Sequence, residues 1–189
     1  MKVLFVCTAN ICRSPVAERV LQRHLESAGW DVVVRSAGTH ASRLTVHRDT
    51  LAAAATMGID LADHVSRAVD RPLLHDDGAD LIVVMTREHL RDVVALDPTV
   101  WGRTFTLKEL VRRGEAAGRR RADESVQTWL SRAGSGRRPM ELLGESSDDN
   151  VADPYLGSPK VYAACIAELD DLVQRLVDLV WPIAREGVA

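Results

Sequence analysis

The sequence has few aromatic residues and few cysteines, and it contains no long apolar run. Aromatic residues make up 4% of the 189 residues, and the net charge of −3 gives no basis for nucleic-acid binding. No stretch of about eighteen apolar residues could cross a membrane, and Met1 and Lys2 lead directly into a short apolar strand pattern instead of a signal-peptide core. We therefore expect a cytoplasmic protein that acts on neither membranes nor nucleic acids.

The cysteines, Cys7, Cys12 and Cys165, show no paired spacing, which is typical of proteins from a reducing compartment. Cys7 and Cys12 lack the histidine and the second cysteine pair that a zinc site would need. We expect no metal and no cofactor. Cys165 lies on the apolar face of a predicted helix, which indicates a buried structural thiol.

The length, a hydrophobic content of 46% and a charged content of 27% are ordinary for a soluble globular protein, and we predict a single domain over residues 1–189. The segment 112–139 departs from this composition. Between Arg112 and Arg138 it holds eight arginines against three acidic residues. We interpret this arginine-rich segment as a solvated surface insertion, and the alternative is an arm that steers anionic substrates.

Strand and helix patterns alternate along the chain. The apolar runs that predict strands are residues 2–6, 31–36, 80–85 and 101–107. The periodic stretches that predict helices are 15–28, 47–57, 87–96, 122–132 and 158–180. Such spacing implies right-handed crossovers, so the predicted fold is α/β: a doubly wound domain with a four-stranded parallel sheet flanked by helices.

The stretch from Cys7 to Pro15 joins the first predicted strand to the first predicted helix. A loop in this place directs backbone N–H groups and the positive end of a helix dipole into one concavity, which binds a dianion and stabilises a thiolate. The guanidinium of Arg13 can hold two oxygens of a phosphorus centre, and Ser14 is placed to donate a hydrogen bond to the sulfur. The sequence therefore predicts a phosphate-binding loop with a reactive thiolate at Cys7.

The Cys-x5-Arg spacing alone also fits a buried cysteine at a strand end and an arginine that caps a helix. The full string from residue 6 to residue 15, Val-Cys-Thr-Ala-Asn-Ile-Cys-Arg-Ser-Pro, resembles the active-site loop of the low-molecular-weight protein tyrosine phosphatases. The resemblance covers residues 1 to about 110 and about 148 to 180, and it leaves the arginine-rich segment unmatched. The predicted phosphate-binding residues are Thr8, Ala9, Asn10, Ile11, Cys12, Arg13 and Ser14.

Phosphoryl transfer through cysteine also needs an acid that protonates the leaving oxygen and then deprotonates water. Asp153 is the candidate, because Pro154 biases it away from helix and allows a loop to carry its carboxyl over the phosphate site. Asp-Pro pairs are also common turn formers. The resemblance implies that Asp153-Pro154-Tyr155 corresponds to the general-acid loop of the family.

The resemblance also implies a set of residues that support the loop. Ser36 and His64 correspond to the two residues that, with Ser14, hydrogen-bond the loop asparagine, here Asn10. Asparagine tolerates the left-handed backbone conformation that a loop with converging amides requires, so a polar network around Asn10 is physically sensible. An ordinary surface histidine is the alternative for His64.

Departures from the family pattern bear on the substrate, which we expect to be a phosphorylated protein. Family members that act on phosphotyrosine often carry two successive tyrosines after Asp-Pro, where this chain has Tyr155 and Leu156. Four segments resemble the bacterial protein-arginine phosphatase branch instead, namely 36–38, 85–89, 105–109 and 153–158.

That branch has a threonine where this chain has Ile11. The isoleucine offers an apolar face to a phenyl ring, with Tyr155 as the opposing wall of the substrate site. We therefore predict hydrolysis of protein phosphotyrosine through a cysteinyl-phosphate intermediate, with Cys7, Arg13 and Asp153 as the catalytic residues. The alternative is a protein-arginine phosphatase.

Two other functions fit the loop less well. A thiol-dependent arsenate reductase uses a similar loop but requires two further cysteines on a mobile segment, and Cys165 on a regular helix is a poor substitute. A silent phosphate-binding module would not need Asp153. A further alternative stays open for Cys12, which either forms a protective disulfide with Cys7 or packs beneath the loop.

Overall fold

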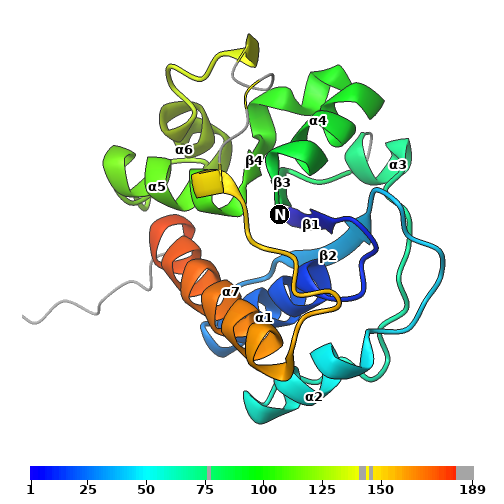
Figure 1. The fold of residues 1–189 in the computed structure, drawn as a ribbon. Coiled ribbons are helices and arrows are strands. Elements are labelled where there is room, and N and C mark those ends of the chain that lie inside the picture. The colour runs from blue at the N-terminus through cyan, green and yellow to red at the C-terminus, as the bar shows by residue number, and fades with distance from the viewer. Residues whose placement is uncertain (76–77, 141–143, 145–146, 182–189) are drawn as a thin grey trace, which may run out of the picture.

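The fold is a parallel sheet with helices on both faces. The computed structural model describes residues 1–75, 78–140, 144 and 147–181 (Figure 1). The sheet order is β2-β1-β3-β4, and every pairing is parallel. The strands are β1 (Lys2–Cys7), β2 (Val33–Gly38), β3 (Leu81–Val84) and β4 (Thr104–Thr106). This confirms the predicted α/β fold.

The helices divide between the two faces because side chains alternate along a strand. Val3 and Phe5 pack on the side that holds α1, α5, α6 and α7, whereas Leu4 and Val6 pack against α3 and α4 (Figure 1). The α-helices are α1 (Arg13–Ser27), α2 (Arg48–Thr56), α3 (Arg71–Leu74), α4 (Arg87–Leu96), α5 (Leu107–Ala117), α6 (Val126–Ala133) and α7 (Pro159–Val180). The 3-10 helices are η1 (Pro98–Arg103) and η3 (Ser147–Asp149).

The second and fourth strands differ most in extent from those predicted. The second ends at Gly38 instead of residue 36, because it stays paired with β1 up to the partner of Cys7. A Cβ at position 38 would overlap the carbonyl oxygen of Thr8, so the backbone of β2 lies directly against the phosphate-binding loop. The fourth strand is only three residues long, since the Asp97 side chain caps η1 through the Thr99 N–H at 2.9 Å.

The arginine-rich segment is not simply solvated. Trp129 and Leu130 of α6 are buried in the main core, and the Arg137 side chain is 3% exposed. Arg137 Nε donates to Glu109 Oε1 at 2.9 Å, and its guanidinium lies 3.9 Å from the Phe105 ring centroid. The interpretation as a solvated insertion is therefore wrong for these residues. The Arg137 guanidinium contacts a carboxylate, carbonyl oxygens and aromatic rings instead of water. The single-domain assignment stays a prediction.

Within the described ranges, none of the helices combines the length and the apolar character that a bilayer crossing demands.

Candidate active site

The predicted phosphate-binding loop lies at the carboxyl ends of the strands. Cys7 ends β1 and Arg13 begins α1, so the loop between them faces the N-terminus of a helix of 15 residues. The sulfur of Cys7 lies 3.0 Å from Ser14 Oγ, which is the contact that the sequence predicts. A cavity of about 280 Å³ opens here, and it is lined by Cys7, Thr8, Ala9, Ile11, Cys12, Arg13, Leu44, Asp153 and Tyr155.

Asn10 holds the loop in shape from a buried position. Its φ is 57°, in the left-handed region, and its amide nitrogen donates to Ser14 Oγ at 2.9 Å and to Ser36 Oγ at 2.8 Å. His64 Nε2 lies 3.0 Å from the carbonyl oxygen of Asn10, and the Arg67 N–H donates to Asn10 Oδ1 at 3.1 Å. Burial lowers the pKa of His64, which favours the neutral ring in this contact.

The Arg13 guanidinium connects the loop to the predicted acid. It is 3% exposed, and Nη2 donates to Asp153 Oδ2 at 2.5 Å while Nη1 donates to the carbonyl oxygen of Val151 at 3.2 Å. Nη2 also reaches Thr8 Oγ1 at 3.3 Å. Among the residues described, Nε is buried with no hydrogen-bond partner. A buried donor in a cavity wall is a group that an oxyanion would satisfy.

Contacts made by Asp149 and Val151 hold the segment that carries Asp153 in place. Asp149 is 2% exposed and accepts from Arg87 at 2.7 Å and from Arg112 at 2.8 Å. Burial alone would raise the pKa of Asp149, but the hydrogen bonds from Arg112 and Arg87 outweigh it and hold the pKa below its usual value. The Val151 N–H donates to the carbonyl oxygen of Met85 at 2.8 Å. These contacts bring residue 153 to a loop that lies 140 positions earlier in the sequence.

The chain is similar to known proteins over most of its length. The family described as low molecular weight phosphotyrosine protein phosphatase matches residues 2–122. The chain belongs to this family. The match ends inside the arginine-rich segment.

Individual relatives of this phosphatase carry two kinds of name. Low molecular weight protein-tyrosine-phosphatase Etp of Escherichia coli K12 is 38% identical over 116 residues, which cover 60% of this chain and 73% of that protein. The protein-arginine-phosphatase of Bacillus subtilis is 30% identical over 180 residues, or 93% of this chain and 94% of that protein. The alignment to the second relative therefore extends past residue 122.

Solved structures of similar proteins share the fold of this chain. A mutant of YwlE from Bacillus subtilis aligns with a TM-score of 0.70 at 28% identity, over 94% of this chain and 97% of that chain. A low molecular weight protein tyrosine phosphatase from T. tengcongensis aligns with a TM-score of 0.71 at 28% identity, over 94% and 98%.

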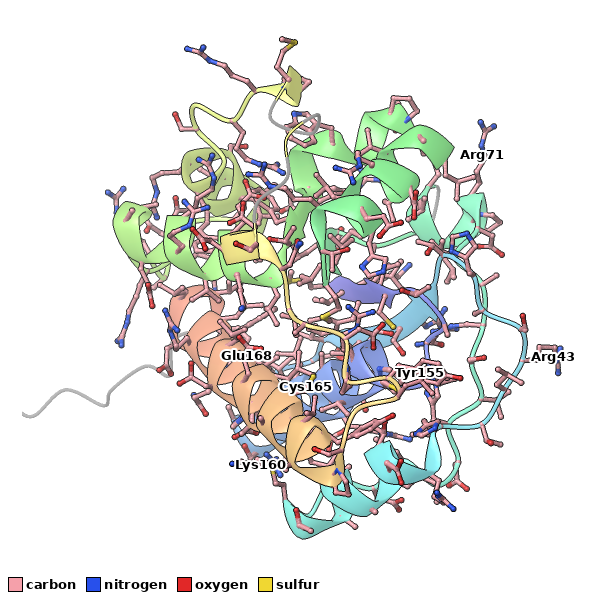
Figure 2. The ribbon with its side chains drawn as sticks, viewed as in Figure 1. Arg43, Arg71, Tyr155, Lys160, Cys165 and Glu168 are labelled. Atoms are coloured by element: carbon pink, nitrogen blue, oxygen red, sulfur yellow. The ribbon has the colours of Figure 1, made fainter. Side chains whose placement is uncertain are left out.

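Around the mouth of the cavity, the phosphatase has apolar walls that the sequence only partly reveals. Ile11 is 9% exposed and packs against Tyr162, so it lines the cavity from a buried position instead of standing free at the rim. Tyr155 and Leu44 also line the cavity, and each side chain is about half exposed. Figure 2 shows Tyr155 on the segment that leads into α7. The His47 ring stacks on Tyr162 and meets Tyr155 edge-on, with centroids 5.5 Å apart in both pairs.

Sequence reasoning missed Leu44, His47 and Tyr162, and it also missed a buried histidine behind the loop. His89 Nε2 lies 2.9 Å from Thr8 Oγ1, and Nδ1 lies 2.9 Å from Thr86 Oγ1. Burial lowers the pKa of His89 to about 3, so the ring is neutral. A neutral ring can accept at Nε2 from the Thr8 hydroxyl, which leaves the oxygen of Thr8 to accept from Arg13.

The other thiols of the phosphatase are not activated. Burial raises the pKa of Cys12 to about 11 and that of Cys165 to about 12. Cys165 lies on α7 (Figure 2), and its thiol is 3.7 Å from the carbonyl oxygen of Ala152. None of the three cysteines forms a disulfide. The two additional thiols thus give no support to an arsenate reductase relay.

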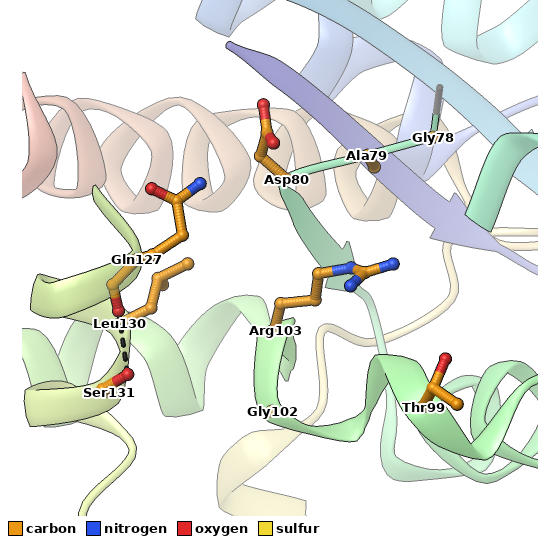
Figure 3. A pocket seen from close by; sticks show the side chains of 9 residues that line it. All are labelled: Gly78, Ala79, Asp80, Thr99, Gly102, Arg103, Gln127, Leu130 and Ser131. Carbon is orange, nitrogen blue, oxygen red and sulfur yellow. Dashed lines mark hydrogen bonds between the residues drawn. The ribbon is translucent and has the colours of Figure 1, made fainter. Parts of the chain in front are cut away.

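A wider cavity of about 410 Å³ lies elsewhere on the phosphatase. Its wall includes Asp80, just before β3, and Gln127 and Ser131 of α6 (Figure 3). Because β3 runs parallel to β1, this is the edge of the sheet opposite Cys7. Neither cysteine nor histidine lines it, whereas Cys7, Arg13 and Asp153 meet in the 280 Å³ cavity, which is therefore the candidate active site. In the part of the chain that the structure describes, no group of three His, Cys, Asp or Glu could hold a metal ion.

Proposed function

We propose that this phosphatase hydrolyses phosphotyrosine in proteins through a phosphoenzyme on Cys7. The observation that carries the proposal is the convergence of the Cys7 sulfur, the Arg13 guanidinium and the Asp153 carboxyl on one cavity at a helix N-terminus. A thiol nucleophile, a bidentate clamp and an acid are the groups that cysteine-mediated phosphoryl transfer requires.

The proposed reaction has two steps. In the first, the Cys7 thiolate forms a bond to phosphorus, the bond from phosphorus to the ester oxygen breaks, and Asp153 gives its proton to that oxygen. In the second, Asp153 takes a proton from water, the resulting hydroxide attacks phosphorus, and the thiolate leaves. Ser14 Oγ, 3.0 Å from the sulfur, donates to the thiolate whenever it carries the negative charge.

The walls of the cavity support an aryl phosphate. Ile11 lines the cavity from a buried position, and Leu44 and Tyr155 add half-exposed apolar surface. Burying a ring between such surfaces contributes up to about 3 kcal/mol. A phosphoguanidinium would place N–H donors against the same surface, and each unpaired buried donor costs about 1 to 3 kcal/mol. The second candidate is protein-arginine phosphatase activity, which is favoured by the alignment that covers 93% of this chain.

The experiment that tests the proposal compares two peptides of the same sequence, one with phosphotyrosine and one with phosphoarginine. We expect a higher kcat/KM for the phosphotyrosine peptide with the purified protein. A higher kcat/KM for the phosphoarginine peptide would overturn the choice of substrate and leave the chemistry of Cys7 standing. If the protein turned over neither peptide and no chromogenic aryl phosphate, both the choice of substrate and the proposed chemistry of Cys7 would be overturned.

Replacing Ile11 with threonine is expected to lower the ratio of phosphotyrosine to phosphoarginine kcat/KM by about tenfold, because the hydroxyl gives guanidinium donors an acceptor. The matched control is Ile11→Val, which removes a similar volume from the same buried side chain without adding a hydroxyl. Equal ratios in the threonine and valine variants would show that the residue at position 11 does not select the substrate.

Replacing Asp153 with asparagine should slow phenyl phosphate, which has a poor leaving group, by about 10²-fold or more, and should slow dinitrophenyl phosphate much less. The amide keeps the size of the side chain and can still accept from the Tyr155 N–H, as Asp153 Oδ1 does at 3.1 Å. Asp148→Asn, an exposed neighbour, is the control. If both substrates slow equally, Asp153 acts structurally.

A further inference from the structure

The inference concerns Glu18 on α1, a half-buried carboxylate behind the phosphate-binding loop. Its Oε2 accepts a hydrogen bond from Ser36 Oγ at 2.5 Å. Ser36 has 0% exposure, and its hydroxyl is the partner of the Asn10 amide described above. Glu18 therefore contacts the network that supports the loop without lining the cavity itself.

The Ser36 hydroxyl has one hydrogen, and the Glu18 carboxylate accepts it. Ser36 Oγ can consequently take part in its contact with Asn10 only as an acceptor. The Asn10 nitrogen then donates one hydrogen to Ser36 and the other to Ser14, at 2.8 and 2.9 Å. On the other side of the amide, the Arg67 N–H occupies Asn10 Oδ1 at 3.1 Å, which agrees with the same orientation.

The direction of donation then passes to the sulfur. Because Ser14 Oγ accepts from Asn10, its own hydrogen can go to one of two acceptors, the Ala37 carbonyl oxygen at 3.3 Å or the Cys7 sulfur at 3.0 Å. A thiolate has no hydrogen and can only accept, and a charged acceptor attracts the hydroxyl more strongly than a carbonyl. The chain from Glu18 thus ends in a donor aimed at the nucleophile.

We infer that Glu18 is a positioning residue that sets the direction of a hydrogen-bond chain running through Ser36, Asn10 and Ser14, so that Ser14 donates to the Cys7 thiolate. Without this carboxylate, the Ser36 hydrogen needs a new acceptor. The Asn10 amide supplies one when it turns its oxygen towards the serines and gives up its bond from the Arg67 N–H. Ser14 then donates to Asn10 instead of sulfur, and the thiolate loses a hydrogen bond.

A charge effect of Glu18 has the opposite sign, which makes the inference testable. A negative carboxylate near Cys7 disfavours the thiolate through space, so its removal would make the thiolate form at lower pH. Loss of the hydrogen-bond chain makes the thiolate form at higher pH. His64, Arg19 and Arg67 are the charged or titratable groups near Glu18, and all three stay in place in the variants below. Around Cys7 these groups are Arg13, Asp153 and Cys12, of which only Cys12 is replaced, in every variant alike.

The experiment measures the rate of Cys7 alkylation by iodoacetamide against pH, with Cys12→Ser and Cys165→Ala as the common background. We expect Glu18→Met, which has a similar length and no acceptor oxygen, to shift the midpoint of the profile upward. Below the midpoint, the alkylation rate should fall about three- to tenfold, the scale of one hydrogen bond. Glu18→Gln keeps an oxygen for Ser36 and should stay within about twofold of the parent.

Two controls separate positioning from folding. Glu26→Met removes an exposed carboxylate from the same helix and should leave the profile unchanged. In a Ser36→Ala background the chain is already cut, so Glu18→Met should give no further upward shift. Thermal melts of every variant establish that each one is folded, and Glu18→Ala, which also lacks an acceptor oxygen, replaces Glu18→Met if that variant is unfolded.

A downward shift of the midpoint in both Glu18 variants would show a charge effect and overturn the inference. An unchanged midpoint in Glu18→Met would also overturn it, as would a full additional upward shift when Glu18→Met is made in the Ser36→Ala background. The inference rests on the proposed function, in which Cys7 is the nucleophile. Alkylation reports the thiolate without any substrate, so a failure here is distinguishable from a failure of the proposed reaction, which phosphatase assays of Cys7→Ser test separately.

Discussion

Replacing Cys7 with serine is expected to abolish turnover of a chromogenic aryl phosphate and to leave binding of phosphate or vanadate intact. The serine hydroxyl is far less acidic than a thiol and forms no useful nucleophile at neutral pH. The backbone amides of the loop, the helix N-terminus and the Arg13 guanidinium all remain, and these groups bind the dianion. Initial rates and calorimetric titration with vanadate measure the two effects separately.

The matched control is Cys165→Ala, which removes a buried thiol that does not line the cavity. It should keep turnover close to that of the parent protein, with some loss of thermal stability from the space it leaves in the core. Turnover that survives in Cys7→Ser would contradict the proposed phosphoenzyme. Loss of vanadate binding together with turnover would show that serine disrupts the loop, so the rate would then say nothing about the nucleophile.

Replacing Arg13 with lysine is expected to lower kcat by about 10²- to 10³-fold, the usual cost of losing a donor that stabilises the transition state. Lysine keeps the charge but is a point donor on a flexible stem. It cannot reach the carbonyl oxygen of Val151 at one end and hold two phosphate oxygens at the other, as the fork of Arg13 can.

Vanadate affinity should weaken in the same variant, because the clamp acts on the trigonal-bipyramidal geometry that vanadate imitates. Arg48→Lys is the control, since the Arg48 side chain is 90% exposed and its nearest carboxylate is the neighbouring Asp49 at 3.5 Å. An unchanged kcat in Arg13→Lys, with the protein folded, would mean that the guanidinium does not act on the phosphate.

The local part of the site was accessible from sequence because its residues are close together in the chain. The contact between Cys7 and Ser14 and the left-handed backbone at Asn10 both lie within the stretch from Cys7 to Pro15, which joins an apolar strand to a helix. The four parallel strands follow from apolar runs spaced by amphipathic stretches.

What escaped prediction depends on contacts between distant residues. Asp149 reads as one of several acidic residues in a polar loop, and only the fold brings Arg87 and Arg112 to it from 62 and 37 positions away. Trp129 lies among arginines, so composition assigned its segment to solvent, whereas the fold buries it. Glu18 has ordinary helical surroundings in sequence, and its bond to Ser36 depends on the packing of α1 against β2.

The separate origins of the cavity walls bear on how this fold diversifies. The groups that grip phosphate come from one continuous loop, whereas Leu44 and Tyr155 come from segments far away in the chain. Leu44 is the wall residue whose segment carries none of the proposed catalytic residues, whereas Tyr155 lies two positions after Asp153 and Ile11 lies within the phosphate-binding loop. A mutation at Leu44 can therefore change the leaving group that fits while Cys7, Arg13 and Asp153 stay unchanged, in a family whose members are named as tyrosine and as arginine phosphatases.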